Sequence, residues 1–185
     1  MRISKGLTIV VWITILVFMM ITITFPKWIT WFYPQPHHTL VFNSAQKNNI
    51  DPYLVFAIIR AESGFKTTAR SPVGAQGLMQ IMPETAEWIA RQKGMTCFDA
   101  VDLHDPEVNI EFGCWYIASL NKEFAGRLPM VVAAYNAGRG RVGEWVLSGQ
   151  WDGSEQRLDS IPYPETRQYV KNVLQNYEAY QAIYK

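Results

Sequence analysis

Glu62 stands at the end of a long apolar stretch, in a setting that suits acid catalysis. The stretch runs from Pro52 to Phe65 and reads PYLVFAIIRAESGF. A helix that is apolar on nearly every side is buried, and its C-terminal end carries the negative pole of the helix dipole. Both influences disfavour the ionised carboxylate, raise its pKa, and so favour a general acid that is protonated near neutral pH. Taken alone, a glutamate at a solvated helix end is the simpler interpretation.

A loop follows this stretch and could bring its backbone close to a ligand. Residues 71–83 read SPVGAQGLMQIMP, and the Gly and Pro residues near their start predict an irregular conformation. The amide of Gln80 offers two donors and an acceptor, which suits the hydroxyl or N-acetyl groups of a sugar. As a bare pattern, a glycine-rich loop with one glutamine is weak evidence.

Two later segments place polar and aromatic groups at helix ends. Residues 133–138 read AAYNAG, and residues 161–170 read IPYPETRQYV. Each has a structural alternative. Asn136 could serve as a helix C-cap, Glu165 could contact the dipole at a helix N-terminus, and Tyr169 could be a packed core ring.

The elements that must position these groups are helices, since no alternating strand pattern of any length occurs. Asp51-Pro52 and Asp105-Pro106 each place an N-cap residue before a proline at the first helical position. Gly94 and Gly138 are typical of helix ends. The sequence predicts a compact, mainly α domain of about seven helices, with a surface loop over 148–162. The expected helices cover 40–48, 83–93, 106–124, 129–137 and 142–147, together with a helix that starts at 52 and has Glu62 at its C-terminal end and a final segment from 164.

The N-terminal segment has the composition of a membrane span. Leu7 to Phe25 is nineteen residues without a charge, which as a helix would extend roughly 28 Å. Arg2 and Lys5 precede it, which predicts a cytoplasmic N-terminus. An uncleaved signal-anchor is favoured over a cleaved signal peptide, because no small-residue cleavage pattern follows. We therefore expect a single-pass protein of the cytoplasmic membrane with an anchor over 1–25, a stalk over 26–39 and an extracytoplasmic catalytic domain over 40–185.

Charge and cysteine content limit the kinds of ligand and cross-link that the chain could have. From Pro34 onward fourteen Lys and Arg face sixteen Asp and Glu, so no basic surface for nucleic acid is expected. Neither metal-ligand spacing nor a cofactor motif occurs among the cysteines and histidines. Cys97 and Cys114 are equally compatible with a disulfide and with two separate buried thiols. A disulfide would enclose sixteen residues and contribute about 3 kcal/mol.

Taken together, the four motifs resemble a known family. AESGF, GAQGLMQIMP, AYNAG and IPYPETRQYVKNVL occur in the order found in lytic transglycosylases of the soluble lytic transglycosylase (SLT) type. That family has a lysozyme-like fold and is related to goose-type lysozyme. The resemblance covers roughly residues 42–180, leaving out the proposed anchor and stalk.

The resemblance implies cleavage of the β-1,4 bond between N-acetylmuramic acid and N-acetylglucosamine in peptidoglycan, without a cofactor or metal. Glu62 would be the single general acid/base, and the C6 hydroxyl of the muramoyl residue would close on C1 to give a 1,6-anhydro end. Substrate assistance by the N-acetyl group would explain the lack of a second carboxylate. The resemblance implies a glycan groove lined by Ser71, Met79 and Gln80, with Tyr135 and Asn136 beside the cleaved bond and Ser63 supporting the local geometry. Glu165 and Tyr169 would approach the Glu62 carboxyl from the last helix, with Tyr169 as a hydrogen-bond partner.

Two other functions stay open at this point. A muramidase of the same fold would let water attack in place of the C6 hydroxyl, with Asp99, Asp102 or another acid as a possible base. A wall-binding or assembly module would use the groove only to hold glycan. The motifs around Glu62 argue against a pure binder, because binding does not require a buried acid. Any protein partner is unknown.

Overall fold

The computed structural model describes residues 5–95 and 99–185 of the chain, and within them the fold is built from helices. No extended strand forms there, and isolated bridges join Gln76 to Arg70 and to Ile81. The predicted mainly α architecture is confirmed. The helices are α1 (Lys5–Phe32), α2 (His38–Lys47), α3 (Pro52–Glu62), α4 (Pro83–Gln92), η1 (Ala100–His104), α5 (Pro106–Glu123), α6 (Leu128–Ala137), α7 (Arg139–Leu147), η2 (Glu155–Ser160) and α8 (Pro164–Tyr184).

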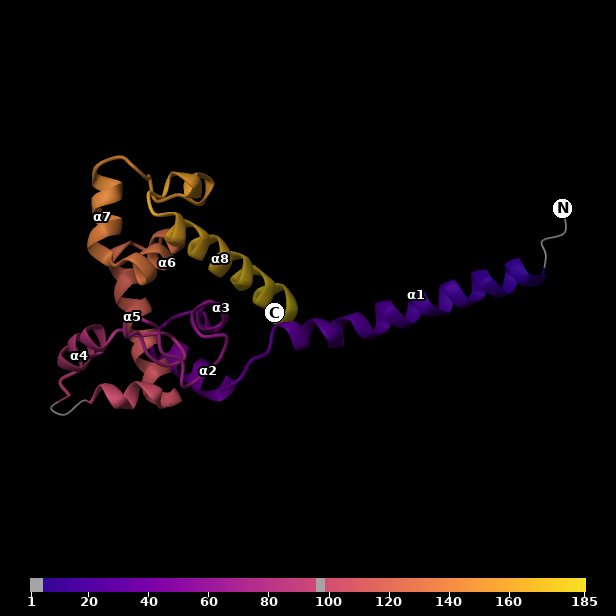
Figure 1. Cartoon of the computed structure of the whole chain (residues 1–185), viewed down its shortest axis with the longest axis horizontal. Helices are drawn as coiled ribbons and strands as arrows, with labels where there is room; N and C mark the ends of the chain where they lie inside the picture. The colour runs from indigo at the N-terminus through magenta and orange to yellow at the C-terminus, as the bar shows by residue number, and fades with distance from the viewer. Residues whose placement is uncertain (1–4, 96–98) are drawn as a thin grey trace.

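Helix α3 is the buried helix that its sequence predicts. All seven residues from Tyr53 to Ile59 are buried, and α3 packs against α2 and α8 inside the body of the molecule (Figure 1). Asp51 caps its N-terminus by accepting a hydrogen bond from the Tyr53 backbone N–H. The equivalent cap at α5 is Asp105, which accepts from the N–H groups of Glu107 and Val108. Both predicted Asp-Pro helix starts are therefore confirmed.

Helices α3 and α8 run antiparallel, and this arrangement builds the site. At one end, the Asp51 carboxylate accepts hydrogen bonds from the Tyr177 hydroxyl and the Gln181 amide, and it pairs with Lys185. These contacts join the start of α3 to the end of α8. The start of α8 consequently lies beside the end of α3, where Glu62 is located.

The segment from 148 to 162 differs from the predicted surface loop. Trp151 is completely buried, as is Ile161, and Leu158 is nearly so. The Trp151 indole N–H donates to the carbonyl of Ser154, and residues 155–160 form η2. Turn-forming and charged residues dominate the local sequence, so its three core side chains gave no periodic signal. Helix α7 also begins three residues earlier than expected, at Arg139, and therefore includes Gly140.

Helix α1 is drawn as a long helix that projects away from the body in Figure 1. It continues past the expected end of the anchor at residue 25 and reaches Phe32. In the part of the chain that the structure describes, no helix is long and apolar enough to cross a membrane. The predicted transmembrane segment over residues 7–25 is therefore not supported.

Candidate active site

The Glu62 carboxyl is the centre of the candidate site. Glu62 is the last residue of α3, and although part of the residue is exposed, its carboxyl group is largely removed from water. This burial raises the pKa of Glu62 to about 7, against a hydrogen bond from Tyr169 that lowers it. The predicted rise in the pKa is confirmed, with desolvation as the main cause.

Two tyrosines lie near this carboxyl. The Tyr169 hydroxyl, on α8, donates to Glu62 Oε1 at 2.6 Å. Burial and the nearby charge of Glu62 raise the pKa of both Tyr169 and Tyr135 well above the usual value. Both phenols therefore remain protonated and can serve as hydrogen-bond donors. The Tyr135 hydroxyl donates a hydrogen bond to the backbone carbonyl of Met79, at 2.8 Å.

The glycine-rich loop is held in place by Asn109, a residue that the sequence motifs do not include. Asn109 lies on α5 and has no exposed surface. Its Oδ1 accepts from the Met79 N–H at 2.7 Å, and its Nδ2 donates to the carbonyls of Gln76 and Leu103 at 3.0 and 2.8 Å. A Cβ at Gly77, which has a φ of +76°, would collide with Asn109 and with the Leu103 carbonyl. The loop thus requires glycine at this position for both backbone conformation and space.

Met79 and Gln80 take different places in this loop. The Met79 side chain is fully buried and packs against Gly113, so it does not line a groove as expected. The sequence did not indicate the burial of Met79, because the glycine against which it packs, Gly113, is distant in the chain. Gln80 does face the cavity described below, and its Nε2 donates to the carbonyls of Gly77 and Ala69. Its φ of +47° is uncommon for a residue with a side chain.

The two serines form local backbone contacts. The Ser63 hydroxyl donates to the Ile59 carbonyl and accepts from the Phe65 N–H, which closes the end of α3 directly after Glu62. The Ser71 hydroxyl accepts from the Ala75 N–H within its own turn. Both therefore shape the backbone around the site, and neither contacts the Glu62 carboxyl.

Asn136 and Glu165 lie on facing helix ends. Asn136 Oδ1 accepts from the Thr166 hydroxyl at 2.8 Å, which connects the end of α6 to the first turn of α8. Glu165 is exposed in that same turn and is not among the groups that shift the pKa of Glu62. The structure therefore brings Tyr169 to the carboxyl, and a role for Glu165 at the site stays a prediction.

A cavity of about 230 Å³ adjoins this constellation. Three of the predicted residues line it, namely Gln80, Tyr135 and Asn136. The rest of the lining is Ile81, Met82, Thr85, Tyr116, Ala137 and Gly138. Tyr135 connects the cavity to the acid, because it lines the cavity and lies close enough to Glu62 for that charge to raise its pKa. A ligand held here would contact the residue that separates the cavity from the candidate acid.

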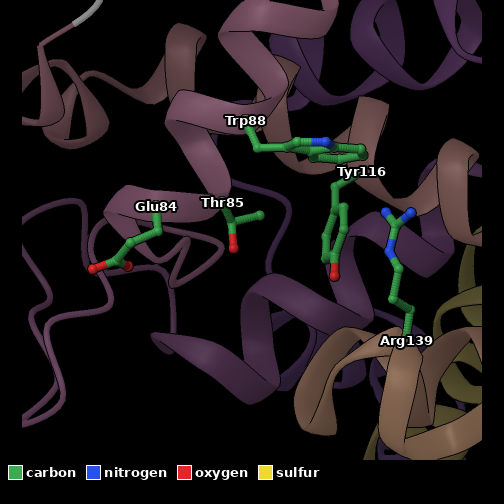
Figure 2. A pocket seen from close by; sticks show the side chains of 5 residues that line it. All are labelled: Glu84, Thr85, Trp88, Tyr116 and Arg139. Atoms are coloured by element: carbon green, nitrogen blue, oxygen red, sulfur yellow. The ribbon is translucent and has the colours of Figure 1, made fainter.

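A second cavity of about 340 Å³ shares Thr85 and Tyr116 with the first. Figure 2 shows its lining: Glu84, Thr85 and Trp88 come from α4, Tyr116 from α5 and Arg139 from α7. Trp88 and Arg139 lie outside the sequence motifs. They come together only in the folded structure, and no local sequence pattern indicates that they do. The two cavities are therefore neighbours, with Thr85 and Tyr116 in the lining of both.

Cys114 is buried, which raises the pKa of its thiol to about 12. Cys97 lies outside the described residues, so the choice between a disulfide and two thiols stays a prediction. Over residues 5–95 and 99–185, no group of three or more His, Cys, Asp and Glu side chains is arranged to hold a metal ion.

The chain belongs to the Transglycosylase SLT domain family, which it matches over residues 39–157. A second family, the soluble lytic transglycosylase helical domain, matches residues 160–185. The soluble lytic murein transglycosylase of Escherichia coli K12 is 38% identical over 156 residues, which cover 83% of this chain and 23% of that protein. The membrane-bound lytic murein transglycosylase C of Haemophilus ducreyi is 37% identical over 112 residues, 56% of this chain and 30% of that protein.

Solved structures agree with this assignment. The 70-kDa soluble lytic transglycosylase of Escherichia coli is 35% identical with a TM-score of 0.75, covering 83% of this chain and 25% of that one. An inactive mutant of the Pseudomonas aeruginosa lytic transglycosylase, with a glutamate changed to glutamine, is 37% identical with a TM-score of 0.74, covering 81% and 24%. The predicted fold of the SLT family is confirmed. This chain spans about a quarter of the length of these relatives.

Proposed function

We propose that this chain is a peptidoglycan lytic transglycosylase that acts on the cell wall, outside the cytoplasmic membrane. It cleaves the β-1,4 bond between N-acetylmuramic acid and N-acetylglucosamine and leaves 1,6-anhydro-muramoyl ends. The observation that carries the proposal is the Glu62 carboxyl, whose pKa is raised to about 7 and which accepts a hydrogen bond from Tyr169 beside a cavity lined by Gln80, Tyr135 and Asn136.

In this mechanism Glu62 acts twice. The protonated carboxyl first gives its proton to the glycosidic oxygen as the C1–O bond breaks, and the substrate's N-acetyl oxygen attacks C1 to form an oxazolinium-like intermediate. The Glu62 carboxylate then takes the proton of the C6 hydroxyl, whose oxygen bonds to C1 while the N-acetyl oxygen leaves. The acid is regenerated and no water is consumed.

A pKa near 7 suits both steps. A carboxyl with this pKa is about half protonated at neutral pH, so it can donate a proton and afterwards accept one. Tyr169 moderates the pKa, because its hydroxyl stabilises the ionised form that exists between the two steps. We infer that Gln80, Tyr135 and Asn136 contact the sugar, whereas Ser63 and Ser71 hold the backbone that surrounds it.

The products distinguish this reaction from hydrolysis. We expect the full-length chain to release muropeptides from purified peptidoglycan whose muramoyl ends are lighter by one water than the reducing ends made by a lysozyme. Mass spectrometry of the released fragments measures this directly. Reducing muramic ends would instead assign a hydrolytic muramidase, and a folded protein that binds glycan but releases nothing would be a wall-binding module.

The pH profile tests the contact between Tyr169 and Glu62. Tyr169→Phe removes a hydrogen bond that lowers the pKa of Glu62, so that pKa should rise. The acid form then persists to higher pH, and the alkaline limb of the kcat/KM profile should move upward by about one pH unit. A limb that stays in place or moves to lower pH would contradict this role for Tyr169.

A further inference from the structure

Thr166 is a buried polar residue that the proposed mechanism does not use. It lies in the first turn of α8, three residues before Tyr169, and only 2% of its surface is exposed. A threonine inside a helix commonly bonds to a carbonyl three or four residues earlier in the same helix. The Thr166 hydroxyl instead donates to Oδ1 of Asn136, near the end of α6, at 2.8 Å. This contact joins α8 to a residue of the candidate site.

The contact determines which end of the Asn136 amide faces the cavity. A buried hydroxyl needs an acceptor for its hydrogen, and among the described residues Asn136 Oδ1 is the acceptor that Thr166 has. The oxygen end of the amide is therefore turned toward α8. Asn136 itself is exposed and lines the cavity of about 230 Å³. Its Nδ2 donates to no protein group in the part of the chain that the structure describes, so its N–H groups remain available to a ligand.

Gln80, which lines the same cavity, has the opposite arrangement. Its Nε2 donates to the carbonyls of Gly77 and Ala69, at 2.9 and 3.2 Å, so both amide hydrogens have protein acceptors. Over the described residues no protein group donates to its Oε1, which is therefore the end available to a ligand. The cavity thus presents one amide as an acceptor and the other as a donor, and contacts within the protein fix both. Side chains held in this way lose little conformational entropy when a ligand binds.

We propose that Thr166 is a positioning residue, which holds the Asn136 amide with its N–H groups toward the cavity so that they donate to an oxygen atom of the bound strand. The inference rests on the proposed function, because it takes the ligand to be a glycan. Without the hydroxyl, the amide is free to turn over and to present its oxygen, which cannot donate. The hydrogen bond is then weakened in the ground state and in the transition state alike, so KM should rise while kcat stays unchanged.

Steady-state kinetics of Thr166→Val on soluble, uncross-linked glycan strands tests this role, with mass spectrometry of the anhydro products as the readout. Valine keeps the shape of the side chain and removes its hydroxyl. We expect KM to rise about fivefold, the effect of one hydrogen bond, and kcat to stay unchanged, because the contact between Tyr169 and Glu62 is retained. Thr166→Ser keeps the hydroxyl and should restore the native KM. A residue that only stabilised the start of α8 would lower kcat, since Tyr169 follows within the same helix.

Asn136→Ala tests the same contact from the other side and does not depend on how Thr166→Val folds, because Asn136 is exposed. It should raise KM by the same factor. Adding Thr166→Val to the Asn136→Ala chain should cause no further rise, because the two residues act as one unit. Asn172→Ala removes another exposed asparagine and is the matched control, which should leave KM and kcat unchanged.

The possible outcomes separate this inference from the proposed function. An unchanged KM in Thr166→Val or Asn136→Ala, a serine variant as impaired as the valine variant, independent effects in the double variant, or a fall in kcat would each overturn the role of Thr166. The release of anhydro products by the native chain would uphold the proposed function in all of these cases. A native chain that releases no such products would refute the proposed function and this inference with it.

Discussion

Glu62→Gln is expected to lower the rate of muropeptide release by at least about a thousandfold, because the amide cannot donate or accept the proton that both steps require. The amide has nearly the same shape and can still accept the hydrogen bond from Tyr169. Fold and glycan affinity should therefore be retained. A fluorescence or chromatographic assay of peptidoglycan solubilisation measures the loss, and a variant with full activity would refute the assignment of Glu62.

The same substitution should also reveal the cost of burying the carboxyl. The folded-state pKa of about 7 lies above the ordinary value of 4.5, so the native chain loses stability as the pH rises from about 4.5 to 7 and not beyond. Glutamine carries no charge at any of these pH values. Glu62→Gln should therefore be as stable as the native chain at pH 4, and more stable by up to about 3 kcal/mol at pH 8. Equal stabilities at pH 8 would contradict the raised pKa.

Asn109→Ala is expected to destabilise the fold by about 3–5 kcal/mol, because it removes three buried hydrogen bonds and opens a small cavity. The Met79 N–H and the Leu103 carbonyl lose the bonds that Asn109 makes to them, and the Gln76 carbonyl keeps only its bond from the Ile81 N–H. The melting temperature should fall by about 10 °C for a chain of this length. Activity should fall as well, since the freed loop carries Gln80 and the Met79 carbonyl that orients Tyr135.

Asn172→Ala is the matched control. Asn172 is exposed on α8 and accepts a hydrogen bond from Gln168, a neighbour on the same helix. Its loss should change stability by less than about 0.5 kcal/mol. Calorimetric melting of both variants decides the matter. Equal melting temperatures for the Asn109→Ala and Asn172→Ala chains would show that the buried asparagine does not organise the loop.

The features that the sequence predicted are those with local causes. Asp51 and Asp105 precede a proline and begin helices as expected. The apolar run after Asp51 ends in a half-buried glutamate with a raised pKa, because burial of that run follows from its composition. The contact between Tyr169 and Glu62 followed from the resemblance of four motifs to one family, and the structure confirms its geometry.

The features that the sequence did not predict depend on contacts between distant residues. Asn109 is a polar residue inside a helix, and nothing near it indicates that it binds a loop some thirty residues earlier. The burial of Met79 depends in the same way on a glycine in α5. Trp151 is buried although its neighbours are turn-forming residues, and the pairing of Trp88 with Arg139 joins two helices. Local patterns carry no information about such pairs.

In the proposed reaction the C6 hydroxyl, and not water, completes the step begun by Glu62. Digestion of purified peptidoglycan by the full-length chain in oxygen-18-labelled water tests it most directly, with a muramidase digest as the reference. If the C6 hydroxyl attacks, the muramoyl ends should have the anhydro mass and carry no label at C1. Ends that carry labelled oxygen at C1 would show attack by water and would contradict the transglycosylase assignment.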